Sequence, residues 1–163
     1  MYKIILLFVF TILLQGCGGV EFVYNKNTTN PIYNNVDYNF SGVEIPSIYQ
    51  YATRYFGSSE NPKYNLLIKI SEQKTKRSVQ SNQAVSKLDY DLSFNYSLSY
   101  RNKNCNAYKQ EIVSRFSYTP KAEGYNFGSD QSLEKLYELA AKESVEKFID
   151  LLSQANIKTC DEN

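Results

Sequence analysis

The sequence predicts an α+β fold: a two-layer sandwich in which a mostly antiparallel sheet of about four strands carries two helices on one face. Three observations lead to this prediction. Apolar and polar side chains alternate strictly from Leu88 to Tyr100, as in a half-buried strand. Apolar residues recur at helical spacing over 45–55 and again over 133–152. Breaker-rich segments separate these stretches, and the predicted order is strand, helix, strand, strand, strand, helix.

The first half of the domain supplies two strands and the shorter helix. Val36–Phe40 alternates weakly and predicts a first strand. Pro46 suits the first turn of a helix, and its apolar stripe ends at Gly57. The alternation over 64–70 predicts a second strand, and the polar stretch 71–82 is expected to connect it to the third.

The second half supplies a long hairpin and the longer helix. Seven apolar or aromatic side chains fall on one face between Leu88 and Tyr100, and the other face is polar. A turn over 101–106 leads to a return strand over 108–118, which Pro120 ends. Ser129 or Asp130 is expected to cap the final amphipathic helix.

The predicted sheet keeps one face polar. A strand of about thirteen residues spans roughly 40 Å, so the face rich in Ser, Asn and Asp is long. Two explanations fit this pattern: the face meets only solvent, or it lies inside a hydrated chamber of another protein. Periodicity does not separate them.

The N-terminus has the layout of a bacterial export signal. Lys3 precedes an apolar run over 4–14, and Leu14-Gln15-Gly16-Cys17 forms a lipobox. A run of about eleven apolar residues is too short to cross a bilayer, which needs about twenty. We therefore expect residues 1–16 to be removed as a signal peptide and Cys17 to become a lipidated N-terminus attached to a membrane.

The remaining chain divides into three parts in this prediction. Residues 17–35 form the lipidated N-terminus and tether, 36–156 the α+β domain, and 157–163 a C-terminal tail. A single domain of this length has room for a real core.

Composition narrows the function. Without Lys3, 17 basic side chains face 17 acidic ones, so nucleic acid is not an expected partner. The chain has no His and no Trp but 15 Tyr, and Tyr suits half-wet contact surfaces. The absence of His excludes His-based catalysis and His-based zinc sites, and we expect no cofactor and no metal.

One enzymatic alternative stays open. Asp89 and Asp91 lie on the same strand face, about 7 Å apart, a separation that could serve an acid/base pair or a divalent metal. A solvated strand face is the simpler interpretation.

The two other cysteines suggest a crosslink. Cys105 lies at the hairpin tip, and the final helix is expected to run back along the last strand and end near that tip. An exported chain meets an oxidising compartment, so we predict a disulfide between Cys105 and Cys160. Two free thiols are the alternative.

Several segments in order resemble one known family. They are the lipobox with Gly18, Leu66-Leu67-Ile68-Lys69-Ile70, Leu88-Asp89-Tyr90-Asp91-Leu92, Ser114-Arg115-Phe116-Ser117-Tyr118 and the final helix. Together they resemble the LptE family of lipopolysaccharide (LPS)-assembly lipoproteins over nearly the whole mature chain.

The resemblance implies a lipoprotein on the periplasmic face of the outer membrane that plugs an LptD-like β-barrel. The pair would place LPS in the outer leaflet. Lys74, Lys76 and Arg77 are then candidate LPS-binding residues, because LPS phosphates call for basic side chains. Alternatives are an auxiliary lipoprotein of a lipid-transport ABC system, an adhesion lipoprotein, or a membrane-tethered carboxylate enzyme using the Asp89–Asp91 pair.

Overall fold

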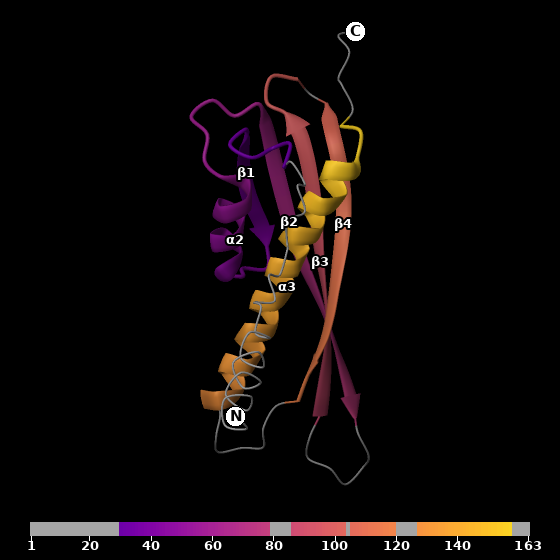
Figure 1. The fold of residues 1–163 in the computed structure, drawn as a ribbon. Coiled ribbons are helices and arrows are strands. Elements are labelled where there is room, and N and C mark those ends of the chain that lie inside the picture. Colours follow the sequence, from indigo (N-terminus) through magenta and orange to yellow (C-terminus); the bar gives the residue numbers. More distant parts are fainter. Residues whose placement is uncertain (1–29, 79–85, 104, 120–126, 158–163) are drawn as a thin grey trace, which may run out of the picture.

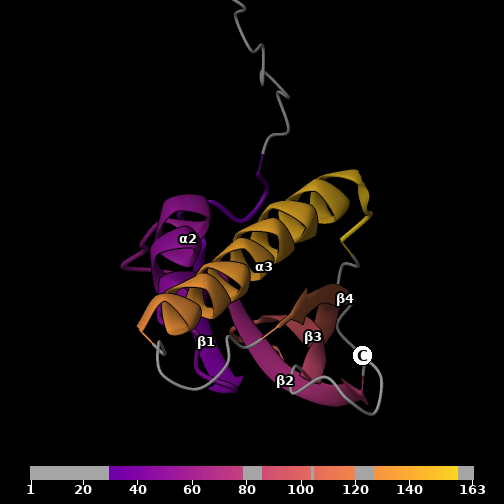
Figure 2. The ribbon, with the colours of Figure 1, turned by 90° about the horizontal axis from the view of Figure 1, so that it is seen from below.

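The computed structural model describes residues 30–78, 86–103, 105–119 and 127–157. These ranges form one four-stranded sheet with two helices on one of its faces (Figures 1 and 2). The predicted two-layer α+β architecture is confirmed. In chain order the elements are β1 (Val36–Gly42), α2 (Ser47–Phe56), β2 (Tyr64–Ser78), β3 (Ser86–Tyr100), β4 (Asn106–Tyr118) and α3 (Phe127–Gln154).

The strands are arranged in chain order, β1-β2-β3-β4. β1 is parallel to β2, with Val36 opposite Tyr64, and α2 makes the crossover that a parallel pair requires. β2 and β3 are antiparallel from Tyr64↔Tyr100 to Ser78↔Ser86. β3 and β4 are antiparallel as well, with a bulge opposite Leu98 and Ser99. The sheet is therefore mixed but mostly antiparallel, as predicted.

One predicted boundary is wrong. Residues 71–78, expected to be part of a connection, continue β2 and pair with β3 to the end of that strand. The apolar alternation stops at Ile70, because Glu72, Lys74 and Lys76 then occupy the positions that face the helices. Beyond Ile70, pairing with β3 keeps β2 extended although its own sequence no longer alternates between apolar and polar residues.

The core lies between the helices and the even-numbered side chains of β2 and β3. Its centre is the stack of Tyr96 on Phe148 of α3, with ring centroids 4.1 Å apart. The Tyr96 hydroxyl lies 2.8 Å from the buried Ser144 hydroxyl, so the polar end of the buried ring has a hydrogen-bond partner. Phe56 of α2 packs edge-on against Phe148, at 6.2 Å, and joins both helices to the sheet.

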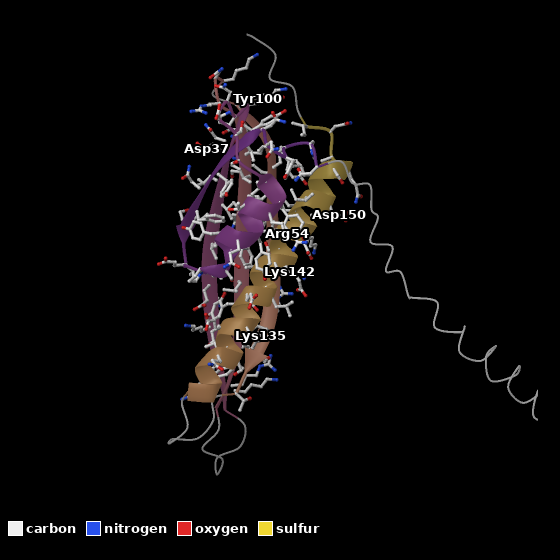
Figure 3. The ribbon with its side chains drawn as sticks, turned by 60° about the vertical axis from the view of Figure 1, so that its left-hand side comes forward. Asp37, Arg54, Tyr100, Lys135, Lys142 and Asp150 are labelled. Carbon is white, nitrogen blue, oxygen red and sulfur yellow. The ribbon has the colours of Figure 1, made fainter. Side chains whose placement is uncertain are left out.

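The helices expose charge on their outer surface. Arg54, Lys135 and Lys142 are all exposed there (Figure 3). Gly57 ends α2 at a φ of 72°. A Cβ at this position would lie 1.9 Å from Asn34 Oδ1, so only glycine fits. Among the described residues, no helix is both long and apolar enough to cross a membrane.

The final helix runs back along β4, so its C-terminal end lies at the same end of the molecule as the β3–β4 hairpin tip (Figure 1). Cys105 at this tip is disulfide-bonded. Cys160 lies outside the described residues, so the pairing of these two cysteines stays a prediction. The signal peptide and Cys17 also lie outside them.

We predict that Phe148→Ala lowers the free energy of unfolding by about 3–5 kcal/mol, because it removes a fully buried ring that both layers contact. The matched control is Leu139→Ala on the same helix, where the side chain is 49% exposed and a change within about 0.5 kcal/mol is expected. Urea unfolding followed by circular dichroism measures both. Equal effects of the two substitutions would contradict this placement of the core.

Candidate functional site

The sheet face opposite the helices is polar, and no described helix covers it (Figure 2). We call it the polar sheet face. It is formed by the odd-numbered residues of β2, β3 and β4, among them Asn65, Lys69, Ser71, Gln73, Asp89, Asp91, Ser93, Asn95, Ser97, Lys109, Glu111, Arg115 and Ser117. Its larger exposed apolar side chains are Leu67, 48% exposed, and Val113, 40% exposed. This surface is the candidate functional site.

The tyrosines of the strands do not lie on this face. Tyr38, Tyr64, Tyr90, Tyr96 and Tyr108 occupy even positions in their strands and belong to the core or pack against it. The polar sheet face therefore owes its affinity for water to hydroxyl, amide and charged groups. The Tyr-rich composition predicted rings on a partly hydrated contact surface. On the strands, however, the tyrosine side chains face the helices.

Two arginine–aspartate pairs cross strands on the polar sheet face. Arg77 Nε of β2 lies 2.5 Å from Asp89 Oδ2 of β3, and the Ser117 hydroxyl of β4 donates to Asp89 Oδ1 at 2.6 Å. One row along, Arg115 Nε lies 3.5 Å from Asp91 Oδ1. Such pairs stabilise the register of the strands and neutralise part of the charge on this surface.

These contacts weaken the enzymatic alternative. Each of the two aspartates already has an arginine partner, and Asp89 also has a hydroxyl partner. A groove of about 350 Å³ passes Asp91, but Ser71, Gln73, Ser93 and Arg115 account for most of its polar lining. Within the described residues, no three metal-ligating side chains gather in one place.

The three candidate LPS-binding residues lie on a strand rather than in a loop, and they do not converge. Strand alternation directs Lys74 and Lys76 to the helix side and Arg77 to the polar sheet face. Lys74 Nζ lies 2.8 Å from Glu72 Oε1 and 5.3 Å from the centroid of the Tyr90 ring. The hydrogen bond from Lys74 to Glu72 raises the lysine pKa.

Glu72 is the polar residue that the sequence interpretation missed. It is largely buried and accepts a hydrogen bond from the Tyr137 hydroxyl of α3. Its signal was present, because it follows Ile68 and Ile70 at strand spacing and therefore had to face the helices. Burial and this hydrogen bond raise the Tyr137 pKa.

A groove of about 520 Å³ opens beside this contact, between the start of α2 and the first half of α3. Its lining combines Ile45, Pro46 and Leu133 with the charged residues Glu72 and Lys74. Lys74 therefore borders a partly apolar hollow, a setting in which a charged head and an acyl chain could both find contacts.

Two further hydrogen bonds between Tyr and Glu join the helices to each other. Tyr51 donates to Glu138 at 2.8 Å, and Tyr55 donates to Glu146 at 2.5 Å. Burial, together with the hydrogen bond to Glu146, raises the pKa of Tyr55 to about 12. Both bonds need a protonated tyrosine, so they link the helical layer to the pH of the medium.

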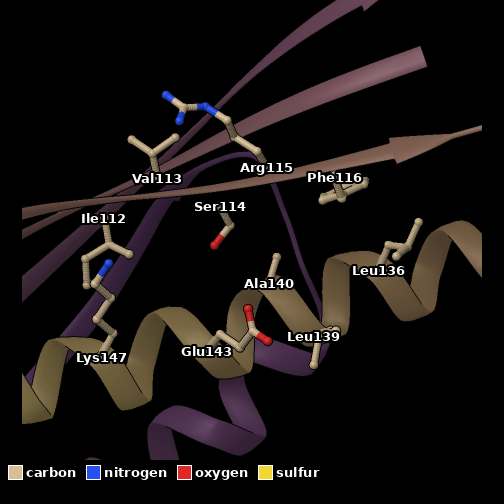
Figure 4. A pocket seen from close by; sticks show the side chains of 10 residues that line it. All are labelled: Ile112, Val113, Ser114, Arg115, Phe116, Leu136, Leu139, Ala140, Glu143 and Lys147. Atoms are coloured by element: carbon tan, nitrogen blue, oxygen red, sulfur yellow. The ribbon is translucent and has the colours of Figure 1, made fainter. Parts of the chain in front are cut away.

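A third groove, of about 260 Å³, lies between β4 and α3. Figure 4 shows Phe116 of β4 near Leu136 of α3 at one end of the groove and Ile112 near Lys147 at the other, with Leu139 and Glu143 between them along the helix. This groove borders the β4 edge of the sheet, whereas the groove beside Glu72 and Lys74 lies on the β2 side.

Comparison with solved structures shows a shared fold. A candidate lipoprotein from Caulobacter crescentus superposes with a TM-score of 0.56 at 12% identity, over 74% of this chain and 89% of that one. The minor lipoprotein from Acinetobacter baumannii gives 0.54 at 12% identity, over 80% and 98%. This chain has their fold. No protein-family model matches the sequence, and no curated protein matches it either.

The rare lipoprotein B from Shewanella oneidensis gives a TM-score of 0.49 at 14% identity, over 73% of this chain and 93% of that one.

We predict that stability falls as the pH rises above about 10. Unfolded tyrosines ionise near pH 10, whereas Tyr55 in the folded chain stays protonated until about pH 12. The unfolded state therefore loses protons first, which favours unfolding across this window. The raised pKa values of Lys74 and Tyr137 act in the same direction.

Urea midpoints at pH 8, 10 and 11 measure this loss. Tyr55→Phe should make the decline above pH 10 less steep, because it removes one of the groups whose pKa differs between the folded and unfolded states. An equally steep decline in this variant would show that Tyr55 is not a source of the effect.

Proposed function

We propose that this chain is an outer-membrane lipoprotein, anchored through Cys17 on the periplasmic face, that occupies the lumen of an LptD-like β-barrel and assists the placement of LPS in the outer leaflet. The observation that carries the proposal is the uncovered polar sheet face. The lumen of an outer-membrane barrel is polar and hydrated, so a protein enclosed there needs a long surface that stays wet.

The geometry of this face supports the proposal. β3 runs for 15 residues, roughly 50 Å at strand rise, and alternates polar side chains toward the uncovered face throughout. Asp89 and Asp91 on this face are each paired with an arginine across strands. Such a pair can approach a polar barrel wall at a lower desolvation cost than two unpaired charges.

The fold and the leader sequence add support. The Caulobacter and Acinetobacter proteins that share the fold are described as lipoproteins. The lipobox of this chain independently predicts a lipidated cysteine. The LptE-like order of segments in the sequence connects the fold to the barrel and to LPS.

We predict that a pull-down of the tagged protein from detergent-solubilised outer membranes retains a large β-barrel protein. Ser93→Trp, in the middle of the polar sheet face, should reduce that yield, since an indole there would separate the face from a barrel wall. The variant's urea midpoint, if unchanged, shows that the fold is intact.

Two results would contradict the proposal. One is recovery of an inner-membrane transporter instead of a barrel, which would favour the ABC-system alternative. The other is purification of the native protein free of acyl chains from the soluble periplasm.

We also propose that Lys74, Lys76 and Arg77 contact LPS phosphates, the two lysines on the helix side of β2 and Arg77 on the polar sheet face. The combined replacement of these three residues by Ala should weaken LPS binding by roughly tenfold, because charge-assisted hydrogen bonds would be lost. The matched control replaces Arg54, Lys135 and Lys142, three exposed basic residues on the outer surface of the helices, and should bind LPS as before. Binding is measured by displacement of a fluorescent LPS. Unchanged binding by the first variant would remove this assignment.

A further inference from the structure

β4 forms one free edge of the sheet, and two turn contacts reveal which of its groups point outward. The Tyr100 N–H donates to the Cys105 carbonyl, and the Arg101 N–H donates to the Lys63 carbonyl. Even residues of β3 therefore bond toward β4, and odd ones toward β2. Since the β4 partners of even β3 residues are also even, the odd residues from Lys109 to Ser117 direct their N–H and C=O groups away from the sheet.

This edge has little protection. No described strand pairs with the outer side of β4. Among the outward-pointing main-chain groups, the Glu111 carbonyl accepts a hydrogen bond from the Gln110 side-chain amide at 2.8 Å. Sheet edges are normally blocked by a proline, a bulge, a covering segment or charged side chains. The charged residues of β4 on the polar sheet face, Lys109, Glu111 and Arg115, carry both signs, so a neighbouring strand can match them. The bulge of β4 lies at its beginning, opposite Leu98 and Ser99, and the strand from Tyr108 to Tyr118 contains no proline. A regular stretch of strand is therefore open to pairing.

We propose that a second copy of this chain pairs with this edge, β4 against β4, antiparallel about a two-fold axis through Val113. The numbers of two residues that lie opposite each other in the two copies then add to 226. Glu111 faces Arg115 of the second copy, and by symmetry Arg115 faces its Glu111. Val113, which is 40% exposed in the single chain, meets its own counterpart at the axis. All of these are odd residues, whose main-chain groups point toward the new neighbour.

The charges select this register from its neighbours. An axis at residue 111 or 115 would place Glu against Glu or Arg against Arg. An axis at 112 would place Lys109 against Arg115, and an axis at 114 would pair no opposite charges. An axis at 110 would also form two opposite-charge pairs, Lys109 with Glu111, but it would carry the pairing across the bulge at the start of β4. The axis at 113 forms two Glu–Arg pairs within the regular part of the strand, and cross-strand pairs of opposite charge stabilise a sheet whereas like charges destabilise it. Each Arg115 would then lie between Asp91 of its own chain and the new Glu111.

The groove between β4 and α3 supplies apolar surface beside the new seam. Leu136 and Leu139 of α3 line it (Figure 4), and Leu139 is 49% exposed. In the paired form, the same groove of the second copy would lie across the seam on the same side of the sheet. Burial of these side chains would add a hydrophobic contribution to the main-chain bonds and charge pairs.

Charge reversal tests the pairing. The processed protein, purified in detergent, is expected to show the mass of a dimer by native mass spectrometry, with a dissociation constant measured by dilution. Glu111→Arg and Arg115→Glu should each weaken self-association by about tenfold or more, because two like-charge pairs then face each other. A mixture of the two variants should associate about as tightly as the wild type, because both pairs in the mixed dimer carry opposite charges.

Recovery in the mixture shows that each variant is folded. Lys69→Glu, on the polar sheet face but on β2, is the matched control and should leave the dimer unchanged. A monomeric wild type, or variants that associate like the wild type, would overturn the proposal, as would a mixture no tighter than the separate variants. The outcome is independent of the barrel proposal, because it requires neither a barrel nor LPS.

Discussion

The contact between the even-numbered face of β3 and α3 is the constraint on which the other features depend. Tyr96 stacks on Phe148, and its hydroxyl reaches the buried Ser144 hydroxyl. This contact fixes which side of every strand is inside, because pairing and strand alternation transmit the choice made on β3 to β2 and β4. The polar sheet face is a consequence of the same choice.

Where one face is buried, the sequence was sufficient to predict the fold. The strict alternation from Leu88 to Tyr100 allows only the apolar, even-numbered side chains to face the helices. The apolar stripe that includes Val145, Phe148 and Leu152 likewise defines the buried side of α3. The length of β2 could not be obtained in this way. Beyond Ile70 both of its faces carry polar side chains, and such a pattern is typical of a loop. Only the partner strand shows that the segment is extended.

The candidate site was predictable in part, for the same reason. That a polar sheet face exists follows from the period-two pattern of β3. The placement of Lys74 and Arg77 on opposite faces could not be predicted, since a segment interpreted as a loop has no strand alternation.

Glu72 was missed because its partner Tyr137 is 65 residues away in the chain, and no local pattern connects them. The pairing of Asp89 with Arg77 and of Asp91 with Arg115 likewise needed the register.

The two free edges of the sheet bear on both proposals. β1 is short, with seven residues, and ends at Gly42, whereas β4 is nearly twice as long. Inside a barrel, the surrounding wall would keep a second copy away from β4. Outside it, the same edge would be open, and pairing about Val113 would cover both the main-chain groups and the exposed apolar side chains beside them. The β4 edge, which is hazardous in a free protein, would thus be shielded from uncontrolled pairing in either setting.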